Sequence, residues 1–203
     1  MKKALVFSLA ALAIGVAHAQ HYAGIEFGSA TADIDEGDVR SQARYLANES
    51  RQTVFWTIDE STTNIRFFGG KKFSEQTKLE LGYFSTGDIK VSYRGMFFGE
   101  AVTKASVSGL DASVIHDPFS NGFFLKAGLH SSKVNSSYTE TVGSFSETTS
   151  SSDSGVGLLY GFGYEKQIAD GLNLRGSFVF YNKLGGESDA DMSMVSVGLS
   201  KNF

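Results

Sequence analysis

One short motif combines residue types and a spacing that could do chemistry. His130 is followed by Ser131 and Ser132, and some lipid A deacylases place a His and a Ser two residues apart on one strand. Those enzymes expose the pair to lipid. His130, however, shares the alternation of Lys126 and Gly128, which predicts that it points inward or sits at a rim. We therefore predict that the chain is not an enzyme, and we keep lipid A modification as the least favoured alternative.

The acidic run Asp33 to Asp38 is the only pattern that suggests a metal. It lacks the Gly at the sixth position and the closing Glu of an EF-hand loop, so a solvated loop is the better interpretation. His21 and His116 have no acid–base partners at a recognisable spacing. The sequence thus predicts no catalytic residue, no metal site and no cofactor.

The first residues predict where the chain is sent. Lys2 and Lys3 form a charged n-region, residues 4–16 carry no charge, and residues 17–19 read Ala-His-Ala, a small-x-small cleavage site. The apolar run is shorter than the ~20 residues that a membrane-spanning helix needs. We predict that residues 1–19 are a cleaved signal peptide for the Sec pathway and that residues 20–203 form one domain.

The composition of the mature chain narrows its class. Cleavage would remove two of 18 basic residues and none of the 22 acidic ones, which gives a net charge of −6 and leaves no basic cluster for nucleic acid. The absence of cysteine means that stability must come from packing and backbone pairing. No run of 18 apolar residues follows the leader, which excludes a helical membrane protein. A soluble periplasmic protein and a β-barrel remain.

Alternation with a period of two decides between them, because segments of about ten residues carry large apolar side chains on one face and small or charged ones on the other. Gly155 to Lys166 is the clearest case, with Val156, Leu158 and Tyr160 on one face and glycines on the other. The pattern predicts an all-β fold, an eight-stranded antiparallel up-and-down transmembrane β-barrel. The predicted strands are 22–29, 63–73, 77–85, 106–116, 122–130, 155–166, 172–181 and 192–203.

The predicted connections alternate in length, as in bacterial barrels with short periplasmic turns and longer outer loops. Long ones fall at 30–62, 86–105, 131–154 and 182–191, and short ones at 74–76, 117–121 and 167–171. Ser131 to Ser154 is rich in Ser and Thr, which predicts a mobile surface loop. Tyrosines near strand ends are predicted to form an interfacial girdle; they are Tyr83, Tyr93, Tyr164 and Tyr181.

Six charged residues fall on the predicted inward face, three of each sign. Buried charges need partners to offset their desolvation, which favours a plugged interior over an open water channel. An eight-stranded barrel is in any case only wide enough for side chains to fill it. This predicted lumen charge network comprises Glu26, Arg66, Glu80, Lys126, Glu165 and Arg175.

Several segments resemble the OmpA-like outer-membrane β-barrel family. They are residues 22–28 (YAGIEFG), 67–70 (FFGG), 79–84 (LELGYF), 155–165, 172–175 (LNLR) and 196–203 (SVGLSKNF), and the resemblance spans nearly all of the mature chain. It implies an eight-stranded fold in the outer membrane. The peptidoglycan-binding domain of full-length OmpA proteins is missing, so cell-wall tethering is not expected.

The resemblance also implies that the barrel-assembly machinery recognises the final strand, with Phe203 as the main recognition residue. Val195, Val197 and Leu199 share its outward face and complete the predicted assembly signal. Lys201 departs from the family, which usually has an aromatic or apolar residue there; its side chain can snorkel to the interface, and the signal is expected to be weaker.

The family's members do several jobs, so the fold alone does not choose a function. We predict a monomeric structural and surface-interaction protein, whose outer loops contact lipopolysaccharide or external partners. Its other expected partners are outer-membrane lipid and, during biogenesis, periplasmic chaperones. A narrow diffusion pore for small solutes is the main alternative, and the paired lumen charges oppose it.

Overall fold

The computed structural model describes residues 21–95 and 99–203; the predicted signal peptide, residues 1–19, lies outside the described residues. The elements are β1 (His21–Ala32), α1 (Glu36–Ser50), β2 (Val54–Asp59), β3 (Ser61–Lys72), β4 (Thr77–Thr86), β5 (Ile89–Gly95), β6 (Gly99–His116), β7 (Phe123–Val142), β8 (Phe145–Ala169), β9 (Leu172–Tyr181), the 3-10 turn η2 (Leu184–Gly186) and β10 (Met192–Asn202). Within these ranges, no helix has both the length and the apolar character needed to cross a membrane.

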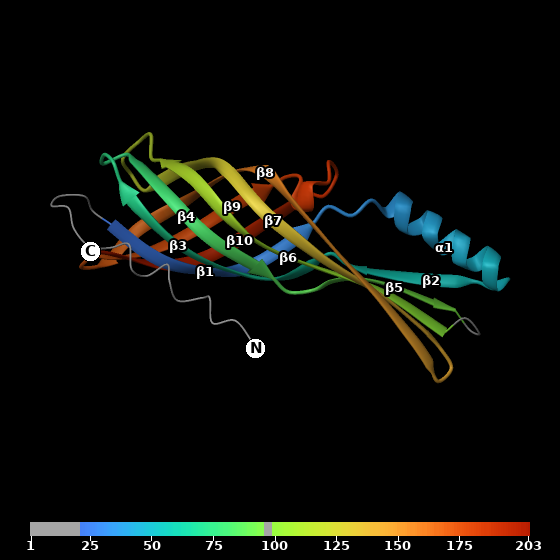
Figure 1. Cartoon of the computed structure of the whole chain (residues 1–203). Coiled ribbons are helices and arrows are strands. Elements are labelled where there is room, and N and C mark those ends of the chain that lie inside the picture. Colours follow the sequence, from blue (N-terminus) through green and yellow to red (C-terminus); the bar gives the residue numbers. More distant parts are fainter. Residues whose placement is uncertain (1–20, 96–98) are drawn as a thin grey trace, which may run out of the picture.

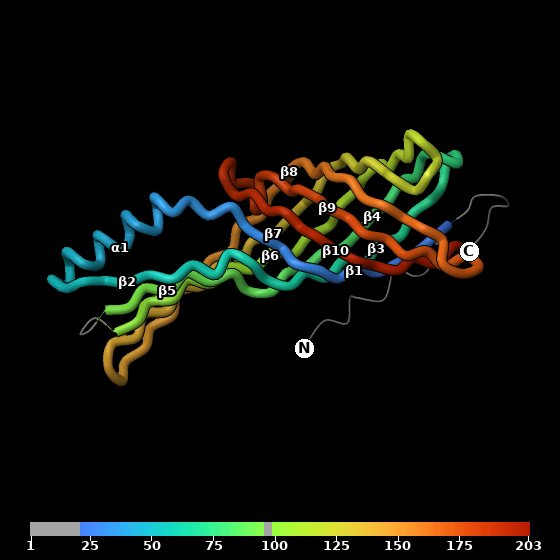
Figure 2. Tube along the Cα trace, turned by 180° about the vertical axis from the view of Figure 1, so that it is seen from behind, coloured from blue at the N-terminus to red at the C-terminus, as the bar shows by residue number. Residues whose placement is uncertain are grey.

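Eight of the strands close into a ring in the order β1, β3, β4, β6, β7, β8, β9 and β10. The ring closes because β1 pairs antiparallel with both β3 and β10, and because β6 also pairs with β7. Every neighbouring pair is antiparallel, which confirms the predicted eight-stranded up-and-down barrel. Figures 1 and 2 show the ring from opposite sides, with the C-terminus at the end of the short turns.

Side chains alternate between the two surfaces of the ring. On the outside Phe27, Leu81 and Tyr160 are 54%, 55% and 54% exposed, whereas Tyr22 and Phe84 on the inside are 3% and 0% exposed. The apolar area on this outer surface is far larger than the apolar area that a soluble monomer exposes to water. The closed hydrogen-bonding ring and this apolar belt are the two requirements for crossing a lipid bilayer with strands.

Part of the same sheet extends beyond the ring. It consists of β2, β5 and the far portions of β6, β7 and β8, and we call it the projecting sheet; α1 lies on one of its faces (Figure 1). The prediction of a mobile loop over Ser131 to Ser154 is wrong, since β7 and β8 stay paired in unbroken register up to Val142 and Phe145. Paired backbones and threonine's β propensity order this segment despite its polarity.

The predicted loop 30–62 contains α1, and the acidic run forms its start. The Asp35 carboxylate caps the helix by accepting a hydrogen bond from the Gly37 N–H at 2.7 Å. Val39, Ala43 and Leu46 recur at helical spacing and pack on one face of the projecting sheet. Tyr93 lies in this cluster and is 5% exposed, so its predicted place in an interfacial girdle is wrong.

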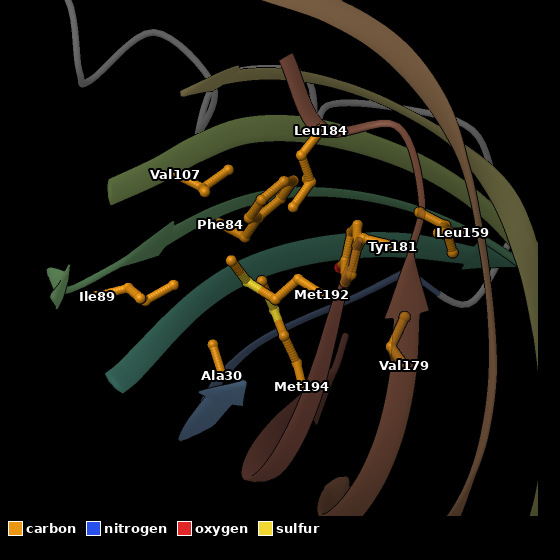
Figure 3. Packing of buried hydrophobic residues seen from close by; sticks show 10 residues of the cluster. All are labelled: Ala30, Phe84, Ile89, Val107, Leu159, Val179, Tyr181, Leu184, Met192 and Met194. Carbon is orange, nitrogen blue, oxygen red and sulfur yellow. The ribbon is translucent and has the colours of Figure 1, made fainter. Parts of the chain in front are cut away.

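The ring holds its own apolar core near the projecting sheet. Phe84, Tyr181 and Leu184 meet there, and the Phe84 and Tyr181 ring centroids are 4.8 Å apart (Figure 3). Tyr181 is fully buried, so it too is wrongly predicted as a girdle residue. Tyr83 and Tyr164, by contrast, are about half exposed on the outer surface.

The turn between β6 and β7 depends on Asp117. Desolvation acts against its charged form, but N–H donors from Gly122, Asn121 and Phe119 outweigh this and hold the pKa of the carboxyl below its usual value. A carboxyl whose pKa is lowered on folding stabilises the fold above its unfolded pKa, about 3.9, and loses that contribution as the pH falls toward the folded value.

We therefore expect Asp117→Asn to be less stable than the wild type at neutral pH and to lose less stability on acidification below about pH 4. Urea midpoints of the detergent-folded barrel across this pH range measure the effect. Parallel curves for the two proteins would contradict it.

Candidate functional site

Arg66 is the centre of a buried ionic cluster inside the ring. Its Nη1 lies 3.0 Å from Glu26 Oε2, and its Nη2 lies 2.8 Å from Glu80 Oε1. Asp111 accepts two hydrogen bonds from the same guanidinium, at 2.8 and 2.7 Å. Gly82 makes room for this group, because a Cβ there would lie 2.5 Å from Arg66 Nη2. The alternation of small and charged residues on β3 and β4 thus builds the cluster.

Arg175 joins the same cluster from β9. Its Nη1 donates to Glu80 Oε2 at 2.7 Å, and its Nη2 donates to Glu165 at 2.6 Å. Lys126 Nζ lies 3.4 Å from the other Glu80 oxygen, and the Tyr22 hydroxyl donates to Glu80 at 3.1 Å. Glu80 is 0% exposed, and its carboxylate contacts basic or hydroxyl side chains from four other strands, namely β1, β3, β7 and β9.

The structure brings all six residues of the predicted lumen network into contact through these pairs. Two further members were missed by sequence reasoning. Asp111 shares its inward face with Ser113, and Lys78 lies two residues before Glu80, where it pairs with Glu165. The alternation on β6 and β4 was the signal that could have found both.

The eight charged side chains balance, since four are basic and four are acidic. Arg66, Glu80 and Arg175 are 3%, 0% and 1% exposed, so the network fills the lumen and leaves these groups out of contact with water. Removing one partner from a cluster of this kind is strongly destabilising, because it leaves an uncompensated buried charge. The arrangement has no exposed nucleophile or general base.

The His130 motif closes the mouth of the ring. His130 Nε2 lies 2.8 Å from the Asn182 carbonyl oxygen, and Ser132 Oγ accepts a hydrogen bond at 3.0 Å from the Gly185 N–H. Both side chains are 2% exposed and point inward. They hold the β9–β10 connection against the barrel, and Leu184 from that connection enters the apolar core. Their position is that of a plug and not of a lipid-facing active site.

No group of three or more His, Cys, Asp or Glu side chains in residues 21–95 and 99–203 is arranged to hold a metal ion. The projecting sheet carries a different kind of feature. A polar hollow of about 420 Å³ lies on it, lined by Asp88, Lys104, Ser106, Asn135, Ser136, Ser137, Ser150, Ser151 and Ser152.

The closed ring, apolar outside and filled with paired charges inside, defines an integral outer-membrane β-barrel protein. The family described as the OmpA-like transmembrane domain matches residues 16–203. The chain belongs to this family, as the sequence segments predicted, and its location is the outer membrane.

Two solved structures of the protein Ail show the same fold. Ail, the attachment invasion locus protein of Yersinia pestis, solved with the heparin analogue sucrose octasulfate, is 9% identical, with 91% of this chain and 99% of that chain covered at a TM-score of 0.56. Ail solved alone is 11% identical, with 91% and 98% covered at 0.56. Neisserial surface protein A is 13% identical, with 90% and 97% covered at 0.47. No curated protein matches the sequence significantly.

Proposed function

We propose that this barrel is an anchor for the projecting sheet, and that this sheet contacts lipopolysaccharide at the cell surface. The long connections of bacterial barrels lie outside the cell, which assigns the projecting sheet to that side. In this proposal residues 1–19 are removed on export. The assembly signal consists of Val195, Val197, Leu199 and Phe203, which lie at or next to the outer face of β10.

One row of side chains on the projecting sheet carries the proposal. Lys90 lies directly opposite Lys104 across β5 and β6 and opposite Asp59 across β2 and β5, and the row continues through Ser137 and Ser150. Like charges directly opposite each other repel, so the Lys90–Lys104 pair is unfavourable when no anion is bound to it. An anionic sugar suits this row, where two amines are served by the single carboxylate of Asp59, because its phosphates pair with the amines and its hydroxyls bond to the serines. Lipopolysaccharide presents both groups.

Vesicles with and without lipopolysaccharide test this. We expect the detergent-folded protein to bind the lipopolysaccharide vesicles in a salt-sensitive manner, and the double variant Lys90→Glu/Lys104→Glu to bind at least tenfold more weakly. The matched control is Lys71→Glu/Lys72→Glu, which makes the same charge change at the end of β3 near the short turns. Equal binding by wild type and the Lys90/Lys104 variant would refute the proposal.

The alternative of a diffusion pore draws no support from the filled lumen. Steady single-channel openings in planar bilayers would nevertheless reverse this ranking. No observation on the described residues favours a lipid A-modifying activity.

A further inference from the structure

The outer portion of β8 has a free edge. Residues Phe145 to Ser154 pair with β7 on one side. On the other side β9 reaches only as far as Leu159, which pairs with Tyr181. Among the described residues, no strand lies beside this portion of β8. Gly185 and Gly186 of η2 lie against Asp153 and Ser154, but from Phe145 to Ser152 every second backbone N–H and C=O points to solvent, which is the arrangement that accepts another strand.

Apart from the acidic side chains of Glu147 and Asp153, this edge lacks the features by which proteins normally block strand addition. Residues 145–154 contain no Lys, no Arg and no Pro, and their register with β7 shows no bulge. The open part of the edge, residues 145–152, is eight residues long, which corresponds to about 26 Å of extended backbone. The opposite edge of the projecting sheet is β2, only six residues long and contacted by α1. An edge this long and regular is a template for an added strand.

The charges beside the edge indicate which side chains an added strand should carry. Glu147 lies directly opposite Glu140 of β7, and Asp153 is on the same face six residues further along. Neither Glu140 nor Glu147 takes part in an ion pair within the described ranges, and the direct opposition of like charges is unfavourable. The other face of this edge carries only hydroxyl side chains, from Ser146 through Ser154.

We propose that the outer edge of β8 binds an extended peptide segment of a partner protein by strand addition. The segment carries Lys or Arg on one face, placed six residues apart to meet Glu147 and Asp153, and small or hydroxyl side chains on the other face. Backbone hydrogen bonds supply affinity, and the alternating side chains supply specificity. The inference rests on the proposed function only in requiring that the projecting sheet lies outside the cell.

A synthetic nine-residue peptide tests this on the detergent-folded full chain. Its sequence, Thr-Lys-Thr-Val-Thr-Val-Thr-Lys-Thr with blocked ends, is the same in both directions, so parallel and antiparallel addition are both sampled. We expect binding, and we expect every second amide between Phe145 and Ser152 to become protected from hydrogen exchange when the peptide is present. A peptide with Glu in place of both Lys should bind at least tenfold more weakly.

The double variant Glu147→Lys/Asp153→Lys should reverse the preference between the two peptides. The control Glu75→Lys, in the short turn between β3 and β4, should leave it unchanged. Absence of binding, or binding without the alternating amide protection, would overturn strand addition. Because lipopolysaccharide binding is assigned to Lys90 and Lys104, either result leaves the vesicle assay free to succeed or fail independently.

Discussion

Replacing Glu80 by glutamine is expected to destabilise the folded barrel by about 3–5 kcal/mol, the usual cost of removing one partner from a buried ion pair. Glu80 accepts hydrogen bonds from Arg175 and Tyr22, and its Oε1 lies 2.8 Å from Arg66 Nη2 and 3.4 Å from Lys126 Nζ, at 0% exposure. Glutamine keeps the shape but removes the charge, so the lumen would hold one cation in excess. Urea unfolding in detergent micelles, followed by the shift between folded and unfolded bands on unboiled gels, measures the change.

The matched control is Glu100→Gln. This residue pairs with Arg94 at 3.0 Å, but the two side chains are 42% and 74% exposed. Solvent-exposed pairs contribute about 0–1 kcal/mol, so this variant should be close to wild type. If both variants cost the same, the lumen network would not be the structural element described above.

Leu81→Arg should cost about 2–4 kcal/mol, because a charged residue on the lipid-facing side of a barrel strand near its midpoint must enter hydrocarbon. Leu81 lies midway along β4 and is 55% exposed in the isolated chain. The same urea titration, repeated in phospholipid bilayers, measures the loss.

Phe145→Arg gives the comparison. Phe145 is 83% exposed, more than Leu81, but it stands at the far tip of the β7–β8 hairpin, where the surroundings are water. We expect it to unfold within about 0.5 kcal/mol of the wild type, as surface substitutions usually do. A loss as large as that of Leu81→Arg would mean that the apolar belt does not face lipid.

Alternation predicted the part of the fold that lies in the membrane because the two surfaces of a barrel strand face different surroundings. Leu172–Tyr181 was predicted with its observed bounds, and the predicted strand at 77–85 falls one residue short of the end of β4. Prediction failed beyond the membrane, where both faces of β7 and β8 are polar. Ser146 to Ser154 looks like a loop because no face is buried, yet backbone pairing with β7 orders it.

Tertiary contacts explain the other differences. Tyr93 and Tyr181 are aromatic residues near strand ends, as girdle residues are. However, α1 covers Tyr93, and Tyr181 lies in the apolar core at the mouth of the ring. Neither covering element shows in the local pattern of β5 or β9. Asp111 was missed for a different reason: the alternation along β6 is compatible with its inward position, but the residue was left out of the predicted network that it joins through Arg66.

A transmembrane barrel needs a hydrophobic phase to fold, and refolding with and without detergent measures this requirement. Residues 20–203, unfolded in urea, should form a compact species that migrates differently before and after boiling when diluted into detergent micelles. Dilution into plain buffer should yield only aggregate, because the outer belt has no hydrocarbon to contact. A monodisperse, folded protein in detergent-free buffer would contradict the transmembrane barrel.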